Sequence, residues 1–132
     1  MQHLLLVFVG GGLGSLLRHA VSASAQELYA RGDPARFPVG TLLVNVIGCL
    51  LIGALASWCG KREPMRLLVL VGLLGGFTTF SSFGLEAIRL ISLGHPGKAV
   101  GYIAVTNLAG LAAVWMMWGG RAVENLPAIG VD

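Results

Sequence analysis

Apolar residues are gathered into four long stretches, and short polar segments separate them. The stretches cover about residues 4–25, 39–58, 65–93 and 99–118. A helix needs ~20 apolar residues to cross the hydrocarbon core of a bilayer, and each stretch reaches that length. The pattern therefore predicts an all-α integral membrane protein, in which residues 1–132 form one transmembrane domain with four spans.

The third stretch is too long for one straight crossing, and its middle is unusual. Residues 75–83 read GGFTTFSSF, so two adjacent glycines precede four hydroxyl side chains. Glycine weakens a helix, and a hydroxyl group is costly in hydrocarbon unless it has a partner. We therefore expect a broken third span, near residues 75–79 at mid-membrane, with carbonyls and hydroxyls free to bind an ion. The alternative is that the hydroxyls only bond back to the preceding turn.

Small residues recur four positions apart in two of the stretches. Gly10 with Gly14, and Gly72 with Gly76, each form such a pair. In membranes these pairs let helix backbones approach one another closely, so we predict close helix contacts at these glycines.

Composition limits the possible functions. Hydrophobic residues make up 55% of the chain and charged residues only 11%, whereas a soluble domain carries about 25% charged residues. The mean hydropathy is +0.80. No clustered basic face favours nucleic acid as a partner. We interpret Cys49 and Cys59 as reduced thiols. A signal peptide normally has a lysine or arginine before its apolar core, and none precedes the first span, so we expect this span to be retained in the protein.

Positive charges are divided almost equally between the two sides of the predicted span arrangement. One side carries four, namely Lys61, Arg62, Arg66 and Arg121, and the other carries five, namely Arg18, Arg31, Arg36, Arg89 and Lys98. A clear asymmetry of positive charge normally sets the orientation of a membrane protein. The near balance therefore predicts insertion in both orientations and pairing as an antiparallel homodimer.

Polar and aromatic side chains inside the spans are candidates for a binding role. The Asn45 amide must be satisfied at mid-bilayer, either by an interhelical hydrogen bond or by donating to an anion along a path; Thr41 lies on the same helical face. Arg18 either extends to the interface or lines a vestibule that attracts anions. Phe80 and Phe83 share one helical face, where their rings either pack or present positive edges to a small anion.

Several other chemistries are poorly supported. No acidic residue lies in the core of a span, Glu86 being the nearest, and the histidines lie near span ends, so we do not expect a proton relay. No histidine and cysteine spacing is typical of a metal site, and no nucleophile–base pair indicates an enzyme. A small multidrug exporter would need a carboxylate in the first span. A subunit that only assists assembly, with hydroxyls joining helices, is the other alternative.

Three motifs resemble the Fluc family of fluoride channels, also called CrcB. They are GGLGSLLR at residues 11–18, GTLLVNVIG at residues 40–48 and GLLGGFTTFSSF at residues 72–83, of which the last is highly specific. Chain length and the four-span layout agree, so the resemblance covers nearly the whole chain. Two positions depart from the family pattern. Ser82 stands where the family often has threonine, and Gly110 lies near a position where a serine is expected.

The resemblance implies a passive channel that exports cytoplasmic fluoride across the bacterial inner membrane, as a multi-pass, dual-topology homodimer with two antiparallel pores. It also implies a structural, non-transported sodium ion (Na+) at the dimer centre, held by the backbone carbonyls of Gly75 and Thr78 from both subunits. The implied fluoride path is lined by Asn45, Phe80, Phe83, Ser81, Ser82, Thr41 and Tyr102. Glu86 would lie near a vestibule, together with Arg18.

Overall fold

The computed structural model describes residues 1–29, 35–59 and 61–119. Every regular element in these ranges is helical. Four helices are long and apolar enough to cross a membrane, and they cover Gln2–Tyr29, Val39–Cys59, Glu63–Ser92 and Pro96–Trp118. The prediction of an all-α membrane protein with four spans is therefore confirmed. Arg31 and Arg121, which enter the comparison of positive charges, lie outside the described residues.

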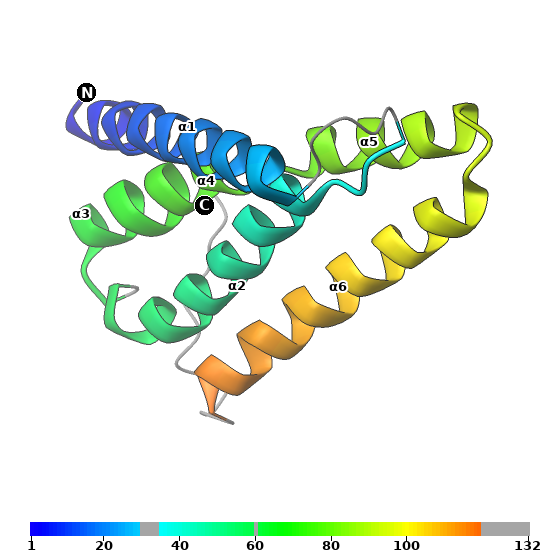
Figure 1. Cartoon of the computed structure of the whole chain (residues 1–132). Coiled ribbons are helices and arrows are strands. Elements are labelled where there is room, and N and C mark those ends of the chain that lie inside the picture. Colours follow the sequence, from blue (N-terminus) through cyan, green and yellow to red (C-terminus); the bar gives the residue numbers. More distant parts are fainter. Residues whose placement is uncertain (30–34, 60, 120–132) are drawn as a thin grey trace.

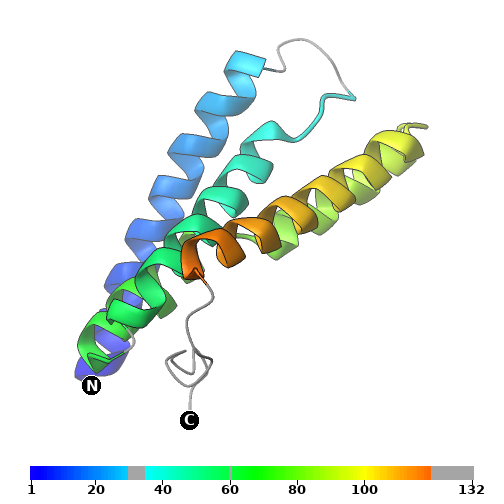
Figure 2. The ribbon, with the colours of Figure 1, turned by 90° about the horizontal axis from the view of Figure 1, so that it is seen from below.

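Two helix contacts are more extensive than the others. Helix α1 (Gln2–Tyr29) packs mainly on residues 66–74 of the third span, and α2 (Val39–Cys59) packs along α6 (Pro96–Trp118) (Figures 1 and 2). Helix α1 also contacts α2, and α5 (Phe80–Ser92) contacts α6, so the four spans are joined. Helix α6 begins at a proline and ends at Gly119, whose φ of 63° is the left-handed conformation that commonly terminates helices.

The third span consists of several short elements. It begins with α3 (Glu63–Met65), continues as the π-helix η1 (Arg66–Leu74) and the short α4 (Gly75–Phe77), and resumes as α5. Between α4 and α5 the backbone of Thr78 is extended, with φ −80° and ψ 157°, and so is that of Thr79, with φ −150° and ψ 121°. The extended residues therefore follow the two glycines, which are themselves helical.

Glycines on α1 allow its backbone to touch the backbone of the third span. A Cβ atom at Gly10 would collide with the carbonyl of Leu68, and one at Gly14 with the carbonyl of Leu73. A Cβ atom at Gly76 would lie 2.5 Å from the carbonyl oxygen of Gly11. The predicted close contacts at these glycines are confirmed, and η1 is the main packing partner of α1 as a result.

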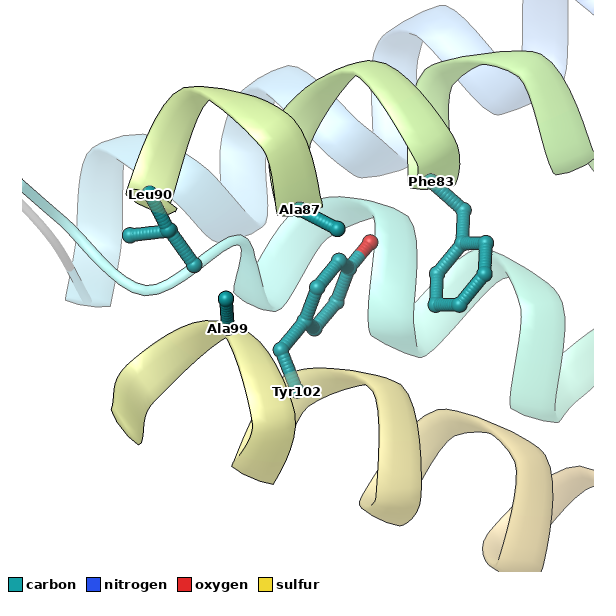
Figure 3. Close-up of a cluster of buried hydrophobic side chains, with 5 residues drawn as sticks. All are labelled: Phe83, Ala87, Leu90, Ala99 and Tyr102. Carbon is teal, nitrogen blue, oxygen red and sulfur yellow. The ribbon is translucent and has the colours of Figure 1, made fainter. Parts of the chain in front are cut away.

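A hydrophobic cluster joins α5 to α6 next to the extended residues. It contains Phe83, Ala87, Leu90, Ala99 and Tyr102 (Figure 3). Tyr102 is completely buried, and its ring lies between the two helices with the hydroxyl directed toward α5. Phe37, which precedes α2, meets the Tyr102 ring edge-on with the ring centroids 5.5 Å apart. The cluster holds the end of α5 rigidly against α6. Both cysteines are free thiols, as predicted.

Candidate functional site

Asn45 holds the extended backbone between α4 and α5. Its Nδ2 donates to the carbonyl of Thr79 at 3.0 Å, and its Oδ1 accepts from the N–H of Thr79 at 2.8 Å. In a continuous helix that N–H would bond to the carbonyl of Gly75 instead. Asn45 therefore makes the interhelical contact that its position suggested, and the amide keeps one N–H that could serve a bound anion.

Hydroxyl groups cluster at the start of α5. The Thr79 Oγ1 accepts from the backbone N–H of Ser82 at 3.2 Å and so caps the helix. The same oxygen lies 3.3 Å from the Ser81 Oγ and donates to the Ser82 Oγ at 3.2 Å. Thr78 differs, because its hydroxyl bonds back to the carbonyl of Leu74 at 3.0 Å. Thr79, Ser81 and Ser82 thus form a connected hydroxyl cluster.

Glu86, one turn beyond Ser82, is the acceptor for two of the expected fluoride donors. Its Oε1 accepts from the Thr41 hydroxyl and its Oε2 from the Tyr102 hydroxyl, both at 2.8 Å. Thr41 is only 3% exposed. A hydroxyl group supplies a single proton. An anion at this point therefore has to compete with the Glu86 carboxylate for both protons.

The two phenylalanines touch but lie in different surroundings. Their ring centroids are 5.5 Å apart and the rings are inclined by 44°. Phe80 is 81% exposed, whereas Phe83 is only 7% exposed and belongs to the cluster around Tyr102. Of the two rings, that of Phe80 is therefore the one that residues 1–29, 35–59 and 61–119 leave uncovered.

Two cavities adjoin the polar groups described above, and we call them the middle cavity and the end cavity. The middle cavity, of about 480 Å³, lies between α2 and α6 beside the extended residues, and its lining includes Asn45, Thr79, Phe80 and Thr106. The end cavity, of about 470 Å³, is lined by residues of α1 and α5 that include Glu86. Asn45 and Thr79 therefore line one cavity, and Glu86, which accepts from Thr41 and Tyr102, lines the other.

Thr106 is a polar residue of the middle cavity that the sequence reasoning missed. It is only 8% exposed, and its hydroxyl has no hydrogen-bond partner within the described part of the chain. Thr106 lies four residues after Tyr102, on the same face of α6, and Gly110 lies four residues further along and lines the same cavity. Spacing from Tyr102 was the signal that could have identified it.

Arg18 lies at the extended backbone and does not line the end cavity. Its Nη1 donates to the carbonyl of Thr78 at 3.3 Å. Gly75 is exposed, and both Gly75 and Thr78 line the middle cavity. Among the described residues no group of three or more His, Cys, Asp or Glu residues could hold a metal. A cation at this place would therefore depend on backbone oxygens.

Comparison with known proteins gives a consistent result across all four spans. The model of the CrcB-like protein family, described as camphor resistance (CrcB), matches residues 5–119. A protein of Methylobacterium sp. (strain 4-46), named fluoride-specific ion channel FluC, is 43% identical over 118 residues, which cover 86% of this chain and 91% of the relative. Fluoride-specific ion channel FluC 2 of Nitrobacter hamburgensis is 45% identical over 121 residues, which cover 83% and 94%.

Proposed function

We propose that this chain, which belongs to the CrcB-like family, forms a passive channel for fluoride in a bacterial membrane. The chain spans the membrane several times, and relatives that align with most of its length are named fluoride-specific ion channels. The structural observation that carries the proposal is the series of amide and hydroxyl groups beside the middle and end cavities. The protein is therefore a channel and not an enzyme.

Donor groups of this kind suit fluoride for a physical reason. Fluoride is small and holds its water tightly, so several donors must replace the hydration shell together. Binding must also stay weak enough for the ion to leave. The Asn45 amide, the hydroxyl cluster and the edge of the exposed Phe80 ring supply such donors without a fixed positive charge. Chloride is larger and should be excluded from a narrow path of this type.

At Glu86, a fluoride ion would take the place of the carboxylate as the acceptor of a hydrogen bond. A fluoride ion that moves along α5 from Ser82 meets the hydroxyls of Thr41 and Tyr102, whose protons point at the Glu86 carboxylate. The ion is solvated there only when one of the two hydroxyls turns its proton from the Glu86 carboxylate to the ion. Glu86 itself lines the end cavity, so it can turn toward water at the same time. Because the hydroxyl gives up a hydrogen bond to the carboxylate in order to bind the fluoride ion, the ion is held only weakly at this point.

The functional unit that we propose is an antiparallel homodimer with two fluoride paths. The near balance of positive charge supports insertion in both orientations. Asn107 is exposed at the middle cavity, and Thr106, which also lines it, has a hydroxyl without a hydrogen-bond partner among the described residues; lipid tails cannot satisfy polar groups. A second copy would cover this face, together with the exposed ring of Phe80.

A structural sodium ion at the centre of the dimer fits the backbone of the broken third span. The carbonyl of Gly75 is released because Asn45 binds the N–H of Thr79, and Gly75 is exposed on the face that a second copy would cover. The carbonyl of Thr78 accepts from Arg18, but a carbonyl oxygen has two lone pairs. One chain offers two such oxygens, which is few for a hard cation, whereas two copies offer four.

Fluoride efflux tests this function against its two alternatives. Purified protein would be reconstituted into fluoride-loaded liposomes, and release would be followed with a fluoride electrode and compared with release of chloride. We expect rapid fluoride release with little chloride release. A multidrug exporter or an assembly subunit predicts fluoride release no faster than from protein-free liposomes, and that result would refute the proposal. The first span lacks an acidic residue before Glu27, near the end of α1, which already disfavours the exporter.

A further inference from the structure

We infer that the turn between α2 and the third span binds the headgroup of an anionic phospholipid. Three cationic side chains define this basic turn, namely Lys61, Arg62 and Arg66. The turn joins two helices that cross the membrane (Figure 1), so it lies at the surface of the bilayer. The site needs only these spans, whichever ion the protein conducts.

The basic turn has an excess of positive charge. Glu63 is the only acidic side chain that the described residues place at this end of the spans, and its Oε1 lies 3.7 Å from the Nε2 of His3. Three cations and one carboxylate leave a net charge of about +2 while His3 is neutral. A lysine or arginine close to an anionic bilayer surface strengthens binding about fivefold. The turn should therefore select anionic headgroups over neutral ones.

Trp58 holds the Arg62 guanidinium near the level of the headgroups. The guanidinium carbon lies 5.5 Å from the centre of the Trp58 ring, and Trp58 is 52% exposed near the end of α2. Tryptophan is enriched where headgroups meet hydrocarbon. Contact with a ring uses none of the five N–H donors of a guanidinium. The Arg62 donors therefore remain for a phosphate group, which arginine can bind through two parallel hydrogen bonds.

The other two cations lie next to Arg62. Lys61 is its neighbour in the sequence and is exposed. Arg66 lies one helical turn further, and its backbone N–H donates to the carbonyl of Arg62 at 2.9 Å, so the two arginines share one face. Arg66 also begins η1, the main partner of α1. A bound headgroup would therefore connect the end of α2 to the start of η1.

All three tryptophans of the chain lie at this end of the protein, namely Trp58, Trp115 and Trp118. Helices α2 and α6 run in the same direction, because Gly53 approaches Val114 while Cys49 approaches Gly110. The two tryptophans near the end of α6 are therefore on the same side of the membrane as the basic turn, and their ring centroids are 6.0 Å apart. An aromatic belt of this kind marks the level of the bilayer surface, which places the three cations among lipid phosphates.

Quenching of Trp58 fluorescence by brominated lipids tests the site. Trp115→Phe and Trp118→Phe would leave Trp58 as the only tryptophan. This parent protein would be reconstituted into phosphatidylcholine bilayers with rising shares of brominated phosphatidylglycerol or, in parallel, of brominated phosphatidylcholine. The ratio of the two association constants gives the lipid preference beside Trp58. We expect a preference of about fivefold or more for the anionic lipid.

Two variants of the parent protein examine the cations. Lys61→Gln combined with Arg62→Gln leaves Arg66 and Glu63, whose charges cancel, so the preference should fall to about one. Lys61→Gln alone keeps the contact between Arg62 and Trp58, and it should give an intermediate preference without disturbing the fluorophore.

Arg36→Gln combined with Arg89→Gln is the matched control. It removes two exposed positive charges at the opposite end of the spans, so it should keep the preference of the parent protein. An excess of inorganic phosphate at constant ionic strength should not displace the lipid. The inference would be overturned by a parent preference near one, by a preference that survives the loss of Lys61 and Arg62, by an equal loss in the control, or by displacement with phosphate.

Discussion

Replacement of Asn45 by leucine would remove the clamp, namely the two hydrogen bonds that Asn45 makes to the extended backbone of Thr79. Leucine branches at the same carbon as asparagine and has the same number of side-chain heavy atoms, but it neither donates nor accepts a hydrogen bond. Both backbone groups of Thr79 would then lose their partner, because Asn45 binds its carbonyl at 3.0 Å and its N–H at 2.8 Å. Thr79 is only 8% exposed, so water cannot replace the amide easily.

The magnitude follows from the two orphaned groups. A buried polar group without a partner costs about 1–3 kcal/mol, so Asn45→Leu should lower the free energy of unfolding by about 2–6 kcal/mol. Interhelical hydrogen bonds in membrane proteins are on average weaker, at about 0.6 kcal/mol each, which sets a lower bound near 1 kcal/mol. The backbone of Thr79 would also be free to bond to Gly75 and close the break, which should abolish fluoride flux.

Reversible unfolding in mixed detergent micelles would measure the loss of stability, and fluoride efflux from liposomes would measure the loss of flux. Ser92→Ala is the control, because the Ser92 hydroxyl bonds only within its own helix, to the carbonyl of Ile88. That substitution should change stability by no more than about 0.5 kcal/mol. If Asn45→Leu matched the control in stability and kept wild-type flux, the clamp would not be what maintains the extended backbone.

Three further predictions concern the rings, the glycines and the cation. Phe80→Ile should reduce fluoride conductance with little loss of assembly, because isoleucine lacks the ring edge but keeps the bulk that a second copy would cover; unchanged conductance would remove the ring from the path. Gly14→Ala should destabilise the protein by about 1–3 kcal/mol in thermal unfolding, whereas Gly12→Ala, with nothing within 4 Å of a Cβ atom, should not. Exchange of sodium for N-methylglucamine should lower the dimer fraction measured by cross-linking, and a constant dimer fraction would contradict the sodium site.

Asn45→Asp distinguishes the clamp from the ion path. At neutral pH the Nδ2 donor that binds the Thr79 carbonyl would be replaced by a carboxylate oxygen, which repels that carbonyl. The carboxylate would also place a negative charge beside the path, so fluoride flux should be lost. The protonated side chain regains one donor and nearly restores the geometry of the amide. Stability should therefore be highest at low pH and should fall as pH rises and the group ionises. Unfolding measured against pH checks this, with Asn45→Leu as the variant that acid cannot rescue.

Hydropathy was sufficient to locate the four spans, because each is a long apolar stretch between short polar segments. The extended backbone of Thr78 and Thr79 within the third span was harder to place. The expectation near residues 75–79 came from two glycines, yet both are helical, and Gly76 instead lets Gly11 approach to backbone contact. The residue that extends the backbone of Thr79 is Asn45, which is 34 positions away in the sequence. Local patterns do not contain a contact of that kind.

At the site, too, the sequence indicated the chemical type of a residue but not the residue that it contacts. Thr41 and Tyr102 were recognisable as hydroxyl donors, but three helices must assemble before Glu86 can accept from both. For Arg18 the sequence allowed an interfacial or a vestibule position, and the contact is with the carbonyl of Thr78, 60 positions away. The π-helical geometry of η1 likewise had no signal in the sequence.

The glycine-mediated contact of α1 has a consequence for biogenesis. Its main partner, η1, begins at residue 66, whereas α1 ends at residue 29, so 36 residues lie between the two in the order of synthesis. At a translation rate of about 5–20 residues per second, α1 has to wait roughly 2–7 seconds in the membrane before that partner emerges from the ribosome. During this interval the face of α1 that carries Gly10, Gly11 and Gly14 has no helix packed against it. The insertion machinery or an early contact with α2 must therefore cover this face.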